Sequence, residues 1–377
     1  MPSPPNYPGD YVGEMPSDVP AIAGVSTAVT AFVGPARRGP VNRPVRVLSV
    51  LEFERRFGGL SAAHETGYAV LQYFQNGGRE AWVVRVARRP SDAQLEAGLR
   101  ALDAVDLFNL LVLPGTTHPS GIALAVAYGE KRRAFLLVDP PAGATTLAEI
   151  HAGVLGLTPA AKSHAAIYYP WVRISDPLHP GQPRLVPPSG TMAGLFARTD
   201  TNRGVWKAPA GLEARLLGVV ALDRVLTDAD SGPLNARGIN CLRSLPHSGF
   251  VAWGGRTLAG DDRSPSDFKY IPVRRTALFI EQSVARGTPW AVFEPNDEPL
   301  WARLRRCVGE FLDRLFRQGA LQGATAREAY FVKCGRDTTT PAGINSGWID
   351  IVIGFAPLKP AEFVILRIRQ SAGQTNP

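Results

Sequence analysis

The sequence has few of the residues that usually build metal and disulfide sites. It contains three cysteines and six histidines in 377 residues. Cys241, Cys307 and Cys334 lie far apart, which is the spacing of neither a zinc motif nor a disulfide framework. The histidines form no HxH or HxxxH pair. We therefore expect reduced, mostly buried thiols, no metal site and no other cofactor.

Long apolar runs and export signals are also missing. No apolar run approaches the roughly 20 residues that a membrane-spanning helix needs. The first 20 residues are rich in proline and contain no basic region followed by an apolar core, the pattern of a secretory signal. We expect a chain that assembles in the cytoplasm and does not insert directly into a membrane.

The chain is basic, but its positive charge is not concentrated. The net charge is +8 and the isoelectric point is near 9.6. Most of the charge lies in scattered arginine doublets, and no block of five basic residues interleaves with aromatics. A nucleic-acid binder usually has such a block, and its binding would weaken steeply with salt. We expect no nucleic-acid partner, whereas a surface rich in arginine suits an acidic protein.

Motifs of catalysis are weak throughout. Glu294 follows a predicted strand, as a glycosidase carboxylate does, and Asp139 is the nearest candidate for its partner, but eight βα units are not evident. Ser189 lies in PPSGT, which is not the G-x-S-x-G elbow of a hydrolase. Gly254 and Gly255 lack the rest of a dinucleotide fingerprint. These absences favour a structural protein over an enzyme.

The first two thirds of the chain alternate between strand and helix patterns. Short apolar runs, typical of strands buried on both faces of a parallel sheet, are separated by helical patterns. The predicted strands are 27–33, 44–50, 81–87, 107–113, 134–138 and 165–172. The predicted helices are one that begins after Ser49 and ends at Gly58, then 63–76, 92–104, 120–129 and 145–155. Residues 173–212 are rich in proline and glycine, so we expect an irregular loop outside the core that binds a ligand or another subunit.

From residue 250 the pattern predicts strands at 250–253, 290–293 and 330–334 and a helix at 270–286. A further helix begins near Glu298, where Asn296 or Asp297 can cap it, and ends at Gly319. Its apolar residues recur with the three-to-four spacing of one buried face, and arginines occupy the other.

Both ends of the chain contain extended, partly apolar segments. Residues 349–355 and 362–369 read as two strands joined by a link with two prolines. Prolines at six of the first 20 positions block helix formation there, yet Tyr7, Tyr11 and Val12 make the segment more apolar than a solvated linker. A terminal strand with open backbone edges closes its own sheet or adds to the sheet of another molecule.

A series of short stretches runs along nearly the whole chain. They are YPGDYVGEMPS, PAIAGVSTAVTAFVGPARRGPVNRPV, FERRFGG, QYFQNGGREAWVVRV, AAIYYPWVRISDP, PPSGTMAGLFARTDTNRGVWKAPAG, LNARGIN, VAWGGRTLA, YIPVRRTALFIEQS, WAVFEPND, GAL-G and GFAPLKPAEFVILRIRQ. Each is a weak motif alone. In their order and combined coverage they resemble the contractile tail sheath proteins of phage tails, tailocins and extracellular contractile injection systems.

The resemblance implies a mechanical function. Sheath subunits stack as rings, typically hexameric, around an inner tube in a metastable extended state. On a baseplate trigger they contract and drive the tube through a target envelope without hydrolysing nucleotide. The partners implied are other copies of the chain, an inner tube protein, and baseplate and terminator or cap proteins, within a phage tail or a released tail-like particle.

The resemblance also implies a fold. We expect an α/β chain with a wound mixed sheet in a subtilisin-like middle domain without a working triad, an α+β C-terminal domain and extended arms at both ends. The expected segments are an N-terminal arm (1–20), an N-terminal α/β segment (21–91), the middle domain (92–260), the C-terminal domain (261–357) and a C-terminal arm (358–377).

Two sets of site residues follow from the resemblance. The arms of the family exchange strands between subunits, which assigns this role to Tyr7, Tyr11, Val12, Phe363, Val364, Ile365, Leu366 and Ile368. A helix of the C-terminal domain faces the inner tube, which assigns tube contact to Arg303, Arg306, Arg314 and Arg317. Two alternatives stay open: these arginines form a solvated face with i,i+4 ion pairs, and the chain is an α/β hydrolase with a divergent active site.

Overall fold

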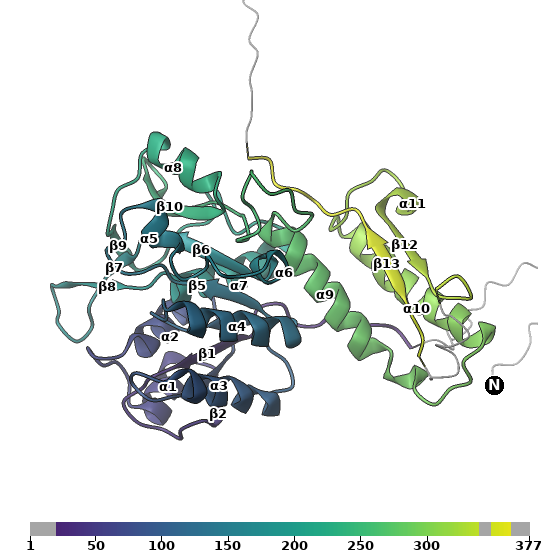
Figure 1. Cartoon of the computed structure of the whole chain (residues 1–377), viewed down its shortest axis with the longest axis horizontal. Helices are drawn as coiled ribbons and strands as arrows, with labels where there is room; N and C mark the ends of the chain where they lie inside the picture. The colour runs from purple at the N-terminus through teal and green to yellow at the C-terminus, as the bar shows by residue number, and fades with distance from the viewer. Residues whose placement is uncertain (1–19, 339–347, 363–377) are drawn as a thin grey trace, which may run out of the picture. The chain divides into compact units, whose positions relative to one another are not determined.

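The computed structural model describes residues 20–338 and 348–362 (Figure 1). The chain divides into two compact units, each described by itself below. The larger unit contains residues 24–282 and 357–377, and the smaller one contains residues 1–23 and 283–356. The division falls within α9 (Ile271–Gly287), which begins in the larger unit and ends in the smaller one.

The larger unit is built on a mixed sheet of eight strands. Their spatial order is β11 (Gly249–Trp253), β10 (Ile239–Leu245), β6 (Ala165–Tyr169), β5 (Phe135–Val138), β4 (Leu110–Val112), β1 (Thr30–Gly34), β3 (Ala81–Arg85) and β2 (Pro44–Val47). The six inner strands are parallel, and β2 and β11 pair antiparallel at the two edges. This confirms the predicted α/β class and its wound mixed sheet. Strands from residues 21–91 and 92–260 share the sheet.

Helices cover both faces of this sheet because its inner strands are apolar on both sides. On β1, Phe32 faces one core, and Ala31 and Val33 face the other. The first core also contains side chains of α1 (Val50–Phe57), α2 (Glu65–Gln75) and α7 (Ser189–Arg203). The second contains side chains of α3 (Asp92–Ala101), the short helix η1 (Leu102–Ala104), α4 (Pro119–Lys131) and α5 (Leu147–His151). Figure 1 shows α3 and α4 side by side over the sheet.

Three further strands and two short helices complete the larger unit. They are β8 (Pro183–Val186), β7 (Val172–Ser175) and β9 (Val219–Leu222), which form a small antiparallel sheet, and α6 (Pro159–Ser163) and α8 (Asp228–Asn235). The predicted strand 165–172 is thus two strands, β6 and β7, separated by a cis Tyr169–Pro170 bond. Strand β10 was not among the predicted strands.

The prediction that residues 173–212 lie outside the core is wrong. They include α7, nine of whose residues are buried. Small residues lowered the apparent hydrophobicity of this stretch, yet they are what lets α7 approach α2. A Cβ atom on Gly190 would lie 2.5 Å from the Cα of Ala69, and one on Gly194 would lie 2.4 Å from the carbonyl oxygen of Tyr73.

The smaller unit is α+β. It contains η2 (Pro289–Ala291), α10 (Glu298–Arg317), α11 (Ala326–Ala329) and the antiparallel pair β12 (Tyr330–Lys333) and β13 (Val352–Phe355). Helix α10 begins after Asp297, whose side chain accepts a hydrogen bond from the backbone N–H of Leu300, as predicted. Its apolar face packs with Trp290, Cys334, Ile349 and Ile351.

The predicted strand 290–293 is wrong, because a 3₁₀ helix begins there at Pro289. Proline lacks an N–H group to donate in a ladder and suits the first turn of a helix. Phe293 follows with a φ of 71°, a backbone conformation that a strand does not accommodate. Its side chain is 102% exposed.

Candidate assembly surface and the anchors of the terminal segments

The arginine face of α10 contains residues in different electrostatic surroundings. Arg303 lies over the ring of Trp290 at 4.6 Å and pairs with Glu294 at 3.7 Å. Arg314 donates to the carbonyl oxygen of Ile22 at 2.5 Å, so its guanidinium holds the chain that enters from the N-terminus. These two arginines therefore have roles within the smaller unit.

The other two predicted tube-contact residues are more available. Arg317 is 78% exposed and pairs with Asp313 at 2.7 Å, one of the i,i+4 pairs expected for a solvated face. Arg306 is exposed and has no ion-pair partner among residues 20–338 and 348–362. The structure thus brings all four arginines onto one helix, where Arg306, Arg314 and Arg317 are exposed and Arg303 is half-buried.

The predicted strand-exchange residues lie outside the described part of the chain. These residues are Tyr7, Tyr11, Val12, Phe363, Val364, Ile365, Leu366 and Ile368. The described residues nevertheless include the points from which both terminal segments start. Pro20 is the last residue of the N-terminal arm, and Glu362 lies near the start of the C-terminal arm (358–377).

Residues 20–22 are attached to α10. The Sγ of Cys307 donates to the carbonyl oxygen of Pro20 at 3.0 Å, and Arg314 binds Ile22 as described. Ile22 is buried, and its side chain packs against Gly287, where a Cβ atom would lie 2.6 Å from it. All three cysteines are buried, as predicted.

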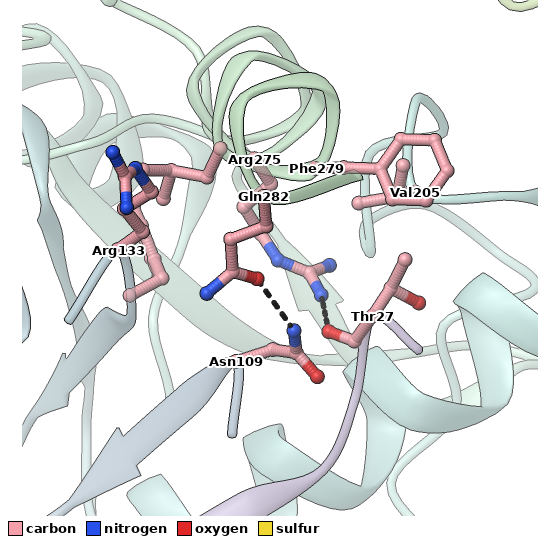
Figure 2. A pocket seen from close by; sticks show the side chains of 9 residues that line it. Thr27, Asn109, Arg133, Val205, Arg275, Phe279 and Gln282 are labelled. Atoms are coloured by element: carbon pink, nitrogen blue, oxygen red, sulfur yellow. Dashed lines mark hydrogen bonds between the residues drawn. The ribbon is translucent and has the colours of Figure 1, made fainter. Parts of the chain in front are cut away.

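The segment before β1 is attached in the larger unit by Arg275. Its guanidinium donates to the carbonyl oxygen of Thr27 at 2.8 Å (Figure 2). It also makes two hydrogen bonds to Asp200 at 2.8 and 2.7 Å. Beside it, Asn109 donates to Gln282 at 3.1 Å. Thr27, Asn109, Arg275 and Gln282 help to line a cavity of about 10 Å³, which is room for about one water molecule. The cavity is therefore too small for a ligand.

Glu362 is attached to Arg256, the largest fully buried side chain among the described residues. The Nε and Nη2 atoms of Arg256 donate to the two carboxylate oxygens of Glu362 at 2.7 and 2.5 Å. Burial lowers the pKa of Arg256, but hydrogen bonds and charge attraction from Glu362 and Asp262 outweigh it and raise the pKa. Sequence reasoning missed this residue, although it lies in VAWGGRTLA, one of the stretches that carry the family resemblance.

The candidate catalytic residues have structural roles. The hydroxyl of Ser189 donates to Asp139 at 2.7 Å, and the backbone N–H groups of Ser189 and Gly115 donate to the same carboxyl group at 2.9 and 3.0 Å. Both side chains are buried, and burial raises the pKa of Asp139 to about 6. The pair joins the end of β5 to the start of α7 and is closed to a substrate. Glu294 belongs to the other unit and pairs with Arg303.

No helix in the described ranges is long and apolar enough to cross a membrane. No group of three or more histidine, cysteine, aspartate or glutamate side chains is placed to hold a metal ion in the part of the chain that the structure describes.

Two family models match most of the chain. The phage tail sheath protein central domain matches residues 91–258, and the phage tail sheath C-terminal domain matches residues 263–371. The tail sheath protein of Burkholderia phage BcepMu is 29% identical over 253 residues, which are 62% of this chain and 51% of the phage protein. The alignment thus spans about half the length of that relative.

Solved structures match over nearly the full length. A chain of the anti-feeding prophage helical sheath in the contracted state is 31% identical with a TM-score of 0.78, covering 97% of this chain and 100% of that one. A chain of the sheath complex of PVC, an extracellular contractile injection system, in the contracted state is 29% identical with a TM-score of 0.78, covering 98% and 99%. This chain belongs to the tail sheath protein family of phages and contractile injection systems.

Proposed function

We propose that the chain is the sheath subunit of a contractile injection machine. It polymerises as stacked, hexameric rings around an inner tube in a metastable extended state, and its contraction drives the tube through a target envelope. The observation that carries the proposal is the similarity, over 97% of this chain, to a contracted helical sheath. The work comes from the free energy stored in the extended assembly, with no enzymatic step and no cofactor.

Strand exchange by the terminal segments holds neighbouring subunits together in this proposal. Support comes from β12 and β13, which in the described residues pair only with each other. A sheet of two strands is marginal alone, and open strand edges accept further strands. Phe331 and Val352 on these strands are exposed, so added strands would cover apolar surface. The segments that we assign to this role are residues 4–20 and 358–370.

The inner tube contacts the arginine face of α10. Arg303, Arg306, Arg314 and Arg317 were all predicted for this role, and the intramolecular contacts of Arg303 and Arg314 favour Arg306 and Arg317 as the charges offered to an acidic tube surface. Exposed ion pairs are worth about 0–1 kcal/mol each. Weak contacts repeated over many subunits suit a surface that must let go on contraction.

Further partners and context follow from the same proposal. The sheath binds a baseplate and a terminator or cap protein, contacts neither nucleic acid nor membrane directly, and assembles in the bacterial cytoplasm before forming part of a phage tail or tail-like particle. We retain the five-segment division and the subtilisin-like character of residues 92–260 as proposals, the latter supported by the parallel sheet covered on both faces.

Negative-stain electron microscopy of the protein, alone and co-expressed with its tube protein, tests the proposal. We expect hollow striated cylinders from the full chain. Deleting residues 1–19 or 363–377 should leave a folded body, with unchanged circular dichroism, that forms no cylinders. Cylinders formed by either truncation would refute strand exchange, and single particles from the full chain with tube and baseplate present would refute the sheath function.

A further inference from the structure

The contacts of Arg256 join the start of the C-terminal segment to the interior of the larger unit. Arg256 is 1% exposed, and its partner Glu362 is 16% exposed. Tyr270 adds a hydrogen bond from its hydroxyl to Glu362 at 3.3 Å. Two parallel hydrogen bonds between a guanidinium and a carboxylate fix direction as well as distance.

The rest of the guanidinium is bound on the side away from Glu362. Its Nη1 atom donates to the carbonyl oxygens of Asn235 and Gly260 at 2.9 and 3.0 Å and to Asp262 at 2.9 Å. All three guanidinium nitrogens therefore donate, and a buried charge with its hydrogen bonds satisfied is held in one orientation.

The backbone of Arg256 is in turn held by the large sheet. Asn240, on β10, donates to the carbonyl oxygen of Arg256 at 2.7 Å and accepts from its N–H at 2.8 Å. The same amide group donates to the carbonyl oxygen of Ile167 on β6 at 3.1 Å. A continuous series of hydrogen bonds thus runs from Glu362 through Arg256 and Asn240 to two strands of the sheet.

We propose that Arg256 is the mechanical anchor of the C-terminal segment. A force applied to that segment is transmitted from Glu362 through the guanidinium to β10 and β6, so residues 357–362 stay bound to the larger unit. The anchor itself is a property of one chain. Its role in carrying load rests on the proposed strand exchange, in which a neighbouring subunit pulls on this segment.

The anchor can be tested in the isolated chain with a spin label. Lys359 is exposed and precedes Glu362 by three residues, and the three native cysteines are buried, so a nitroxide on Lys359→Cys reports the motion of this segment. We expect Glu362→Gln and Arg256→Gln each to convert an immobile spectral component into a mobile one. Asp261→Asn is the matched control, because it breaks the neighbouring pair with Arg237 at 3.0 Å and leaves Glu362 untouched.

Assembly with the tube tests the load-bearing role separately. We expect Glu362→Gln cylinders to fall apart at lower urea concentrations than those of the full native chain or of Asp261→Asn. An unchanged label spectrum in both anchor variants overturns the anchor, whether or not the chain forms a sheath. A mobile label with cylinders of native stability overturns the load path. If the native chain forms no cylinders, the proposed function fails and the load path fails with it, while the spectrum still decides the anchor.

Glu362→Gln keeps the test informative if Arg256→Gln does not fold. Glu362 contacts only the edge of the network, and glutamine retains its size and one acceptor oxygen. Restoring the carboxylate with Glu362→Asp is expected to recover part of the immobile component, and a label as mobile as in Glu362→Gln would count against the ion pair as the anchor.

Discussion

At the scale of residues, buried arginines connect segments that lie far apart in the sequence. Arg275 and Asp200 are both 4% exposed and pair through two hydrogen bonds while Arg275 also holds Thr27. Removing one member of such a pair leaves an uncompensated buried charge. In this basic chain, arginines therefore hold segments together in the interior of the protein, in addition to those that lie on its surface.

We predict that Asp200→Asn lowers the free energy of unfolding by about 3–5 kcal/mol, because the Arg275 guanidinium then lies buried without its carboxylate. Urea denaturation followed by circular dichroism measures the change. The control is Glu80→Gln, which breaks an exposed pair with Arg46 at 2.8 Å and should cost about 0–1 kcal/mol. Equal effects of the two substitutions would contradict the prediction.

Asp139 gives a second prediction, on pH. Its folded-state pKa of about 6 lies above the ordinary value of 3.8, so the folded protein holds this proton more tightly than the unfolded chain. The resulting stabilisation is complete below about pH 3.8 and is lost as pH rises through 6. Relative to Asp139→Asn, the native protein should therefore gain roughly 2 kcal/mol from pH 7 to pH 4.

Urea denaturation of both proteins across this pH range measures the difference. Asp261→Asn is the contrasting control, because the hydrogen bond from Arg263 lowers the pKa of Asp261. Its contribution is present above the ordinary pKa and is lost as pH falls, so the native protein should lose stability relative to that variant on acidification. A difference between native and Asp139→Asn proteins that does not change with pH would show that the carboxyl group titrates normally.

At the scale of elements, the close approach of α2 and α7 depends on glycine. The missing side chains at Gly190 and Gly194 let the two helices meet backbone to backbone on one face of the large sheet. We predict that Gly194→Ala lowers the free energy of unfolding by about 1–3 kcal/mol, since the added methyl group must displace Tyr73 or Asn76.

The matched control for this substitution is Gly309→Ala in α10, where an added Cβ meets no atom within 4 Å. Alanine has the higher helix propensity, so that variant should be neutral or more stable by up to about 1 kcal/mol. Thermal unfolding of the two variants beside the native protein measures the contrast. A Gly194→Ala protein as stable as the native one would mean that α2 and α7 adjust without cost.

At the scale of the whole molecule, function depends on what the surface offers to other chains. If Arg306 and Arg317 face an acidic tube, reversing both to glutamate should weaken co-assembly with the tube more than self-association of the sheath. Co-sedimentation with the tube and cylinder formation without it measure the two effects. Lys131→Glu with Arg133→Glu, which reverses two charges in the larger unit, is the control.

If the Arg306 and Arg317 double variant lost co-assembly with the tube and self-association equally, this face would lie between sheath subunits. A salt titration adds an independent check, because contacts between exposed charges weaken as ionic strength rises. Co-sedimentation that does not respond to salt would contradict an electrostatic tube contact.

Local patterns in the sequence were enough to predict those helices and strands whose apolar periodicity agrees with the residues that begin and end them. Helix α10 has an aspartate cap at Asp297 and one apolar face, and the short strands β4 and β5 are apolar on both sides. Each of these signals comes from residues that are neighbours in the sequence, so it can be read without knowledge of the tertiary structure. The family resemblance likewise needed only the order of the motifs.

Tertiary structure decided what depends on distant partners. The burial of α7 depends on α2, which lies more than 100 positions earlier in the chain and whose backbone approaches Gly190 and Gly194. The pairing of Arg256 with Glu362 spans 106 positions, and nothing local distinguishes these two residues from other arginines and glutamates. Composition and periodicity thus determined the class of the chain, whereas only packing in three dimensions determined which charges are buried, which are anchors and which remain for partners.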